Sequence, residues 1–139
     1  MSLKDCEEKG KETFTNLYGG TAQGVQTLLD DIYPDMGMCQ TPNTKRRPTL
    51  VCNTGWFSNT IGYGLVYGFT DVLSLVETSY TLVTSLISVD TAQQIAWHLA
   101  NAQRAGATLE EVRAVREIAM EVGRKAGVEW RNGVPEVEE

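Results

Sequence analysis

His98 is the only histidine in this 139-residue chain, and histidine is the side chain best suited to move a proton near neutral pH. It recurs with Ile95, Leu99 and Ala102 at the spacing of one helical face, which predicts that His98 faces the protein interior. Two interpretations follow. His98 is either a general acid or base in an active site, or a core residue satisfied by hydrogen bonds.

Three consecutive helices are expected to position this histidine. Each begins with a capping side chain, followed three residues later by a side chain that can reach back to the N–H of the cap. The pairs are Ser74 with Glu77, Asp90 with Gln93 and Thr108 with Glu111. Apolar residues recur at helical spacing between these signals, so residues 74–127 are predicted to form three packed helices.

The same region resembles a known family. Residues 98–112 read HLANAQRAGATLEEV, which closely resembles the H-x-x-x-A-x-x-x-G-A-T-x-E-E-[VI] signature of the carboxymuconolactone decarboxylase family, including its alkylhydroperoxidase D-type members. Residues 67–80, YGFTDVLSLVETSY, look like the segment that precedes this signature in the decarboxylase-like branch. The resemblance implies an all-α fold that assembles as a homotrimer or homohexamer.

Two further helices are predicted near the N-terminus. One runs from about Leu3 to Leu17 and ends at the pair Gly19-Gly20, and a short one runs from Thr21 until Pro34 closes it. We therefore expect residues 1–139 to form a single all-α domain, a bundle of about six helices.

The cysteines bear on which branch of the family the chain resembles. The peroxidase branch carries C-x-x-C-x-x-x-H, and the two cysteine positions correspond here to Thr91 and Gln94, which form no thiolate. The cysteines present are Cys6, Cys39 and Cys52, without C-x-x-C spacing. Peroxidase chemistry is thus disfavoured, since it would need Cys39 and Cys52 to meet near His98.

The matching histidine of the family lies in the active-site region, so the resemblance makes His98 the candidate for proton transfer. Glu77 is the nearest acidic candidate, although a capping-box glutamate already has a structural role. Gln94, one turn before His98, could donate to a carboxylate or lactone oxygen. Arg104 and Arg113 are the nearest cations, and each is either an anion ligand or a solvated side chain.

Residues 56–69, WFSNTIGYGLVYGF, are predicted to form a helix despite three glycines that each cost about 1 kcal/mol there. Glycines on a helix permit close approach of another helix or of a ligand. Tyr63 and Tyr67 are four residues apart and share a face, so Trp56, Tyr63 and Tyr67 are candidates for the wall of an apolar substrate pocket. Tight helix packing is the alternative.

Residues 38–55, MCQTPNTKRRPTLVCNTG, show neither helical nor strand periodicity and are predicted to be a loop insertion. Three interpretations stay open: a functional loop, an exposed surface insertion and a translated intron. The last is considered because residues 34–37 would join smoothly to residue 56 if the segment were removed.

Composition excludes several function classes. A formal charge of −6 argues against a nucleic-acid partner, and residues 129–139, with four glutamates, are predicted to be an acidic tail. No apolar run approaches the roughly 20 residues of a membrane span, and the N-terminus lacks the apolar core of a signal peptide. Three unclustered cysteines, an odd number, favour a reducing, cytoplasmic location. The C-terminus Glu-Val-Glu-Glu matches no retention or peroxisomal address.

The function predicted on these grounds is that of a cofactor-free decarboxylase or isomerase of secondary metabolism. It would act on a carboxylated lactone, enol or polyketide-like cyclic compound through an enolate. His98 would transfer the proton, and Gln94 or Tyr67 would stabilise the oxyanion. No metal is expected, since one histidine and unpaired cysteines leave no zinc site. The alternative is a non-catalytic oligomeric scaffold or binding protein of the same fold.

Overall fold

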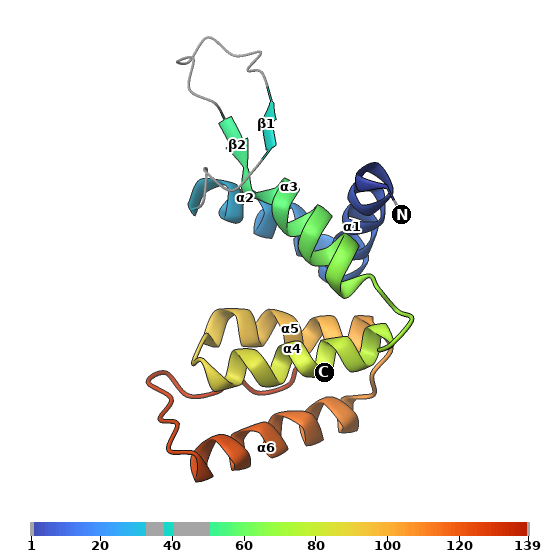
Figure 1. The fold of residues 1–139 in the computed structure, drawn as a ribbon. Helices are drawn as coiled ribbons and strands as arrows, with labels where there is room; N and C mark the ends of the chain where they lie inside the picture. Colours follow the sequence, from blue (N-terminus) through green and yellow to red (C-terminus); the bar gives the residue numbers. More distant parts are fainter. Residues whose placement is uncertain (1, 33–37, 41–50, 139) are drawn as a thin grey trace. The chain divides into compact units, whose positions relative to one another are not determined.

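The computed structural model describes residues 2–32, 38–40 and 51–138, with side chains for 2–29 and 56–138. The chain forms two compact units, Met1–Phe69 (unit 1) and Thr70–Glu139 (unit 2) (Figure 1). Helical periodicity shows which face of a helix is buried but not which helices pack together, so the sequence does not reveal this division. That all 139 residues form one carboxymuconolactone decarboxylase-like domain stays a prediction.

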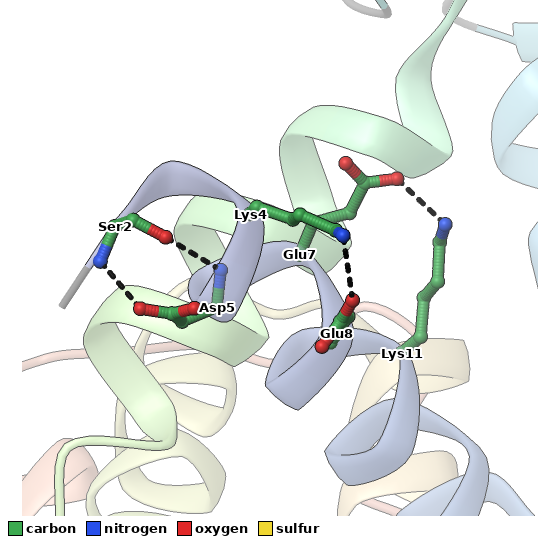
Figure 2. Close-up of polar contacts among 6 residues, drawn as sticks. All are labelled: Ser2, Lys4, Asp5, Glu7, Glu8 and Lys11. Carbon is green, nitrogen blue, oxygen red and sulfur yellow. Dashed lines mark hydrogen bonds and ion pairs between the residues drawn. The ribbon is translucent and has the colours of Figure 1, made fainter.

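In unit 1, α1 (Leu3–Tyr18) begins with a reciprocal capping box (Figure 2). The N–H of Asp5 donates to Ser2 Oγ at 3.2 Å, and the N–H of Ser2 donates to the Asp5 carboxylate at 2.7 Å. These hydrogen bonds hold the pKa of Asp5 below its usual value. Two i, i+4 ion pairs follow on the exposed face: Lys11 with Glu7 at 2.6 Å and Lys4 with Glu8 at 3.8 Å.

The N-terminal helix boundaries are close to those predicted. Gly19 caps the end of α1 with a φ of 52°, a left-handed conformation that favours glycine. A single 3-10 turn, η1 (Gly19–Thr21), leads into α2 (Ala22–Ile32).

Two short strands lie in the segment that the sequence predicted to be a loop. β1 (Met38–Gln40) and β2 (Val51–Asn53) pair in antiparallel register, with Cys39 directly opposite Cys52. Three-residue strands are too short to show a period in the sequence. Residues 41–50 lie outside the described residues, so the insertion and the translated intron both stay predictions.

The predicted helix over residues 56–69 is α3 (Thr54–Phe57) followed by a π-helix, η3 (Ser58–Tyr67). α1 packs directly on η3 through two glycines. A Cβ on Gly10 would collide with the carbonyl of Asn59, and one on Gly64 with the carbonyl of Cys6. The interpretation of tight packing is therefore confirmed for Gly64.

Unit 2 contains the three predicted helices, α4 (Leu75–Ser88), α5 (Ala92–Arg104) and α6 (Leu109–Lys125). The capping boxes at Ser74 and Thr108 are both formed. The predicted box at Asp90 is wrong, because Thr91 is the N-cap and makes no side-chain capping bond. Asp90 instead has a left-handed backbone, φ 57°, and its carboxylate accepts the N–H of Arg131 at 3.1 Å.

The aliphatic core of unit 2 includes two residues of the segment predicted to be an acidic tail. Val134 and Val137 join a cluster whose helical members include Val83, Ile87, Ile95, Leu99 and Val112. The segment 130–138, which we name the C-terminal strap, therefore packs on the unit. The prediction of an acidic tail rested on the four glutamates and took no account of these two valines.

Side chains of α6 and the strap itself hold the strap in place. The Arg116 guanidinium donates to the carbonyls of Val134 and Pro135 at 2.7 and 2.6 Å and pairs with the Glu136 carboxylate at 2.6 Å. The indole N–H of Trp130 donates to the carbonyl of Ile87 at 2.7 Å. Arg116 occupies a core position of α6, and these acceptors are what allow a charged group to be buried there.

The helical fold class is confirmed, with one short strand pair among the described residues. The count of about six helices and the oligomeric assembly stay predictions. No helix in the described ranges is both long and apolar enough to cross a membrane.

Candidate functional site

The six residues predicted to form the site are divided between the two units. His98, Glu77 and Gln94 lie in unit 2, on α4 and α5. Trp56, Tyr63 and Tyr67 lie in unit 1, on α3 and η3. The two sets are therefore described separately.

His98 lies on the buried face of α5, as predicted, with 8% of its surface exposed. Ile95, Leu99 and Ala102 on the same helix are fully buried. Burial lowers the pKa of His98 to about 4, since the charged imidazolium loses its hydration there. At neutral pH the imidazole is uncharged, so it can accept a proton but has none in excess to donate.

The two residues predicted to assist His98 are exposed. The N–H and the hydroxyl of Ser74 donate to the Glu77 carboxylate at 2.8 and 2.7 Å. These bonds lower the pKa of Glu77, which therefore stays ionised in its capping role. Gln94 is exposed one turn before His98.

Asn101, one turn after His98 on α5, was missed by the sequence interpretation. Only 1% of its surface is exposed. Its Oδ1 accepts a hydrogen bond from the Arg104 guanidinium at 3.2 Å, whereas its Nδ2 has no acceptor within the described part of the chain. An unsatisfied buried donor costs about 1–3 kcal/mol, so each such group in a native protein calls for an explanation, such as a bound water or a ligand.

A sequence signal for Asn101 did exist. Asparagine is a weak helix former, and here it sits inside a helix three residues after a buried histidine. Positions three apart lie on neighbouring parts of one helical face. A polar residue in that place could have been identified as a partner of His98 for a bound ligand.

In unit 1, Tyr63 is the centre of an aromatic cluster. Its hydroxyl shares a hydrogen bond with that of Tyr18 at 2.9 Å, and its ring packs against Phe14 and Tyr67 with centroids 5.0 and 5.2 Å apart. Burial raises the pKa of Tyr63, so its hydroxyl stays protonated. The structure thus brings Tyr63 and Tyr67 together, while Trp56 lies partly buried on α3.

Each unit has a cavity, and neither is lined by the six predicted residues. The cavity of unit 1 measures about 170 Å³, below the roughly 300 Å³ usual for a small-molecule site. It is lined by Lys11, Phe14, Thr15, Ala22, Gln23, Gln26 and Asn59. The cavity of unit 2 measures about 540 Å³ and is lined by Ser88, Val89, Asp90, Val128, Glu129, Arg131 and Asn132.

Cysteines and acidic side chains are the remaining groups that could act as nucleophiles or metal ligands. Cys6 is a buried free thiol on α1. The strand register sets Cys39 opposite Cys52 in the backbone. A thiol mechanism would also need this pair to lie near His98. No three His, Cys, Asp or Glu side chains among the described residues gather closely enough to hold a metal ion.

Comparison with known proteins identifies two fungal relatives, both named Peroxisomal protein 2. The chain is 27% identical over 128 residues to the Saccharomyces cerevisiae protein, an alignment covering 91% of the chain and 38% of that protein. It is 35% identical over 72 residues to the Schizosaccharomyces pombe protein, covering 52% of the chain and 34% of that protein. The chain therefore spans between a third and two fifths of the length of these relatives.

The alignment with the Saccharomyces cerevisiae protein is longer than either unit, so the similarity extends over both. No family model matches the chain, and no solved structure matches it. The resemblance to the carboxymuconolactone decarboxylase family therefore stays a prediction.

Proposed function

We propose that the chain is a carboxymuconolactone decarboxylase-like module that transfers a proton at carbon. Its substrate would be a carboxylated lactone, enol or polyketide-like cyclic compound, which it decarboxylates or isomerises without a cofactor. One observation carries the proposal: α5 buries a neutral imidazole, His98, one turn from an amide N–H of Asn101 that has no acceptor among the described residues. The signature at residues 98–112 supports the same family.

The two groups suit an enolate mechanism. In isomerisation, His98 removes a proton from carbon, the bonding electrons shift into an enolate, and the imidazolium returns the proton to a second carbon. In decarboxylation, the carbon–carbon bond breaks, carbon dioxide leaves and the bonding electrons form the enolate. His98, which takes a proton from solvent when the carboxylate substrate binds, then protonates the carbon as an imidazolium and returns to its neutral form. In both reactions the Asn101 N–H stabilises the enolate oxygen by a hydrogen bond.

The low pKa of His98 explains why a carboxylated substrate is favoured. An imidazole with a pKa of about 4 is a weak base. A negatively charged substrate bound beside it stabilises the imidazolium and raises that pKa toward neutrality. The substrate carboxylate thus supplies the charge that activates His98, a role that exposed Glu77 does not fill.

Arg104 is the positioning residue of this arrangement. Its guanidinium holds the Oδ1 of Asn101, which leaves the Nδ2 as the group that can bind a substrate oxygen. Arg104 is exposed at the end of α5. This assignment replaces Gln94 and Tyr67 as the proposed oxyanion donors.

The test incubates the protein with a panel of β-keto acids and carboxylated lactones in D₂O. NMR monitors the exchange of substrate protons for deuterium and the loss of the carboxylate as carbon dioxide. We expect His98→Gln to abolish turnover. Asn101→Ala should lower kcat about 10²- to 10³-fold, as removal of one oxyanion donor does elsewhere. Gln94→Ala is the matched control on the same helix and should keep activity within about twofold. Turnover by His98→Gln at the wild-type rate would contradict the proposal.

A second candidate function is a non-catalytic scaffold of the same fold. The observation that favours it is that Glu77 is committed to a helix cap and Gln94 is exposed, so neither assists His98 in the expected way. A scaffold would turn over no member of the panel, and His98→Gln would change its stability alone.

For location, the names of both relatives support a peroxisome rather than the expected cytoplasm. We propose that the module acts there. A fluorescent fusion of the chain expressed in Saccharomyces cerevisiae should coincide with a peroxisomal marker, and diffuse fluorescence would contradict this assignment.

A further inference from the structure

Helix α6 has two apolar faces, and only one of them is used inside unit 2. Val112, Ala119 and Gly123 are buried on the face that packs on the unit. On another face, Ile118 and Val122 are one turn apart and 63% and 60% exposed. Single exposed aliphatic residues are normal, but two at helical spacing on a helix whose core face is already filled form a continuous stripe.

The stripe has a symmetric sequence. Glu111, Ala114, Ile118, Val122 and Lys125 follow one another at spacings of three, four, four and three residues, centred on Ile118. The five residues span about 80° around the helix, at 100° per residue, with Ala114 and Val122 at the two edges. We call them the α6 stripe. Spacings of three and four residues are those through which two helices pack side by side.

The charges at its ends are complementary to those of a second, antiparallel copy. The first turn of α6 is acidic, with Glu110 and Glu111, and the last turn is basic, with Arg124 and Lys125. A twofold axis at Ile118 sets Glu111 of each chain opposite Lys125 of the other. The helix dipoles then run antiparallel, which also favours this pairing.

Both charged groups can make this contact without giving up the bonds they already have. Lys125 pairs with Glu121 at 2.7 Å, and an ammonium group has three donors. The Glu111 carboxylate accepts at Oε2 from the N–H and hydroxyl of Thr108 and also interacts with the Tyr80 hydroxyl. The two oxygens of a carboxylate offer about four lone-pair sites, so it can accept a further donor.

We infer that the α6 stripe is the contact surface for a second copy of this chain, paired antiparallel about a twofold axis through Ile118. Each Ile118 packs against its counterpart, and Ala114 of each chain lies against Val122 of the other. The small side chain of Ala114 permits the helices to approach closely there. The contact is isologous and doubles whatever assembly the chain otherwise forms.

The test is the mass of the full chain in solution, measured by sedimentation equilibrium over a wide concentration range. We expect an even number of chains for the wild type and half that number for Ile118→Glu. Val72→Glu is the matched control, since Val72 is 80% exposed and lies off α6. Val72→Glu introduces the same charge and should leave the mass of the assembly unchanged.

A charge reversal tests the orientation. Lys125→Glu sets like charges opposite each other at both ends and should weaken association about tenfold or more, with the loss reduced by salt. Arg124→Glu makes the same change about 100° around the helix and should leave association within about twofold. Equal effects of the two variants would contradict antiparallel pairing.

A cysteine at the axis gives a covalent readout. With Ile118→Cys, each new thiol faces its own copy, so mild oxidation with a soluble disulfide should yield a cross-linked dimer, whereas Val72→Cys should not. A wild-type chain that stays monomeric at every concentration would overturn the inference. So would an unchanged mass for Ile118→Glu accompanied by lower stability, because the stripe would then be covered by the chain itself.

Discussion

Unit 1 and unit 2 are both helical, yet they are stabilised in different ways. In unit 1, α1 and η3 touch backbone to backbone through Gly10 and Gly64, and an aromatic cluster around Tyr63 fills the remaining space. In unit 2, aliphatic side chains fill the core and an extended strap closes it, fixed by Arg116. In unit 1, the absence of a side chain at Gly10 and Gly64 permits close helix packing. In unit 2, the buried guanidinium of Arg116 holds the strap against the helices.

The units also differ in the titratable groups that they bury. Unit 1 buries tyrosine hydroxyls, whose raised pKa keeps them protonated and therefore weak as acids. Unit 2 buries His98, whose lowered pKa keeps it unprotonated at neutral pH. Both groups are neutral, but only the second can accept a proton. The comparison therefore places the base of the proposed chemistry in unit 2.

The largest effect is expected when a side chain is added at a helix contact of unit 1 that only glycine fits. Gly64→Ala places a Cβ against the carbonyl of Cys6, so α1 and η3 must separate. We expect a loss of about 3 kcal/mol or more, seen as amide hydrogen exchange that speeds up in unit 1 alone.

Gly24→Ala is its control. A Cβ at Gly24 meets nothing within 4 Å and Gly24 lies inside α2, so the alanine should stabilise the helix by up to about 1 kcal/mol. Equal protection in both variants would mean that α1 and η3 do not touch as described.

The next effect is the acid sensitivity of unit 2. The pKa of His98 is about 4 in the folded state and 6.5 ordinarily, so between these values the unfolded chain binds a proton that the folded unit does not. Stability should therefore fall by about 3 kcal/mol as pH drops from 6.5 to 4 and stay constant above 6.5. His98→Gln should lack this slope in urea unfolding, and an identical pH profile in both proteins would contradict the buried neutral histidine.

Releasing the strap should have a somewhat smaller effect. Arg116→Met removes the donors to Val134 and Pro135 and should cost about 2 kcal/mol, with residues 130–138 losing protection from exchange first. Arg124→Met, on the exposed side of the same helix, should cost less than about 0.5 kcal/mol. If the amides of residues 130–138 exchange as fast in the wild type as in Arg116→Met, Arg116 does not hold the strap.

The smallest effect is expected at a cap. Thr108→Ala removes the hydroxyl that accepts from the N–H of Glu111 at 3.2 Å and should cost about 1 kcal/mol. The same change at Thr91, the N-cap of α5 that makes no capping bond, should cost less. Equal losses would mean that the capping box adds nothing to α6.

These elements also show what could be predicted from the sequence. Local signals served well: the boxes at Ser74 and Thr108, the stop at Gly19 and the inward face of His98 all depend on neighbouring residues. The capping box predicted at Asp90 was wrong, because its carboxylate accepts from the N–H of Arg131, 41 positions away, rather than from its own helix.

What the sequence did not reveal depends on contacts between distant residues. Arg116 and Val134 are brought together only by folding, and no local pattern records which helices pack together. Within the candidate site, the role of Glu77 stays a prediction beside its role in the cap, and Asn101 was not identified because its unsatisfied amide is visible only in the structure.

The most direct test of the account is an NMR titration of His98. The chain has a single histidine, so the imidazole C2 proton gives one resonance that needs no assignment by mutation. We predict a pKa near 4 for the free protein and a rise toward neutrality when a carboxylated substrate analogue binds. A pKa near 6.5 that no such analogue shifts would contradict both the buried neutral base and the chemistry proposed for it.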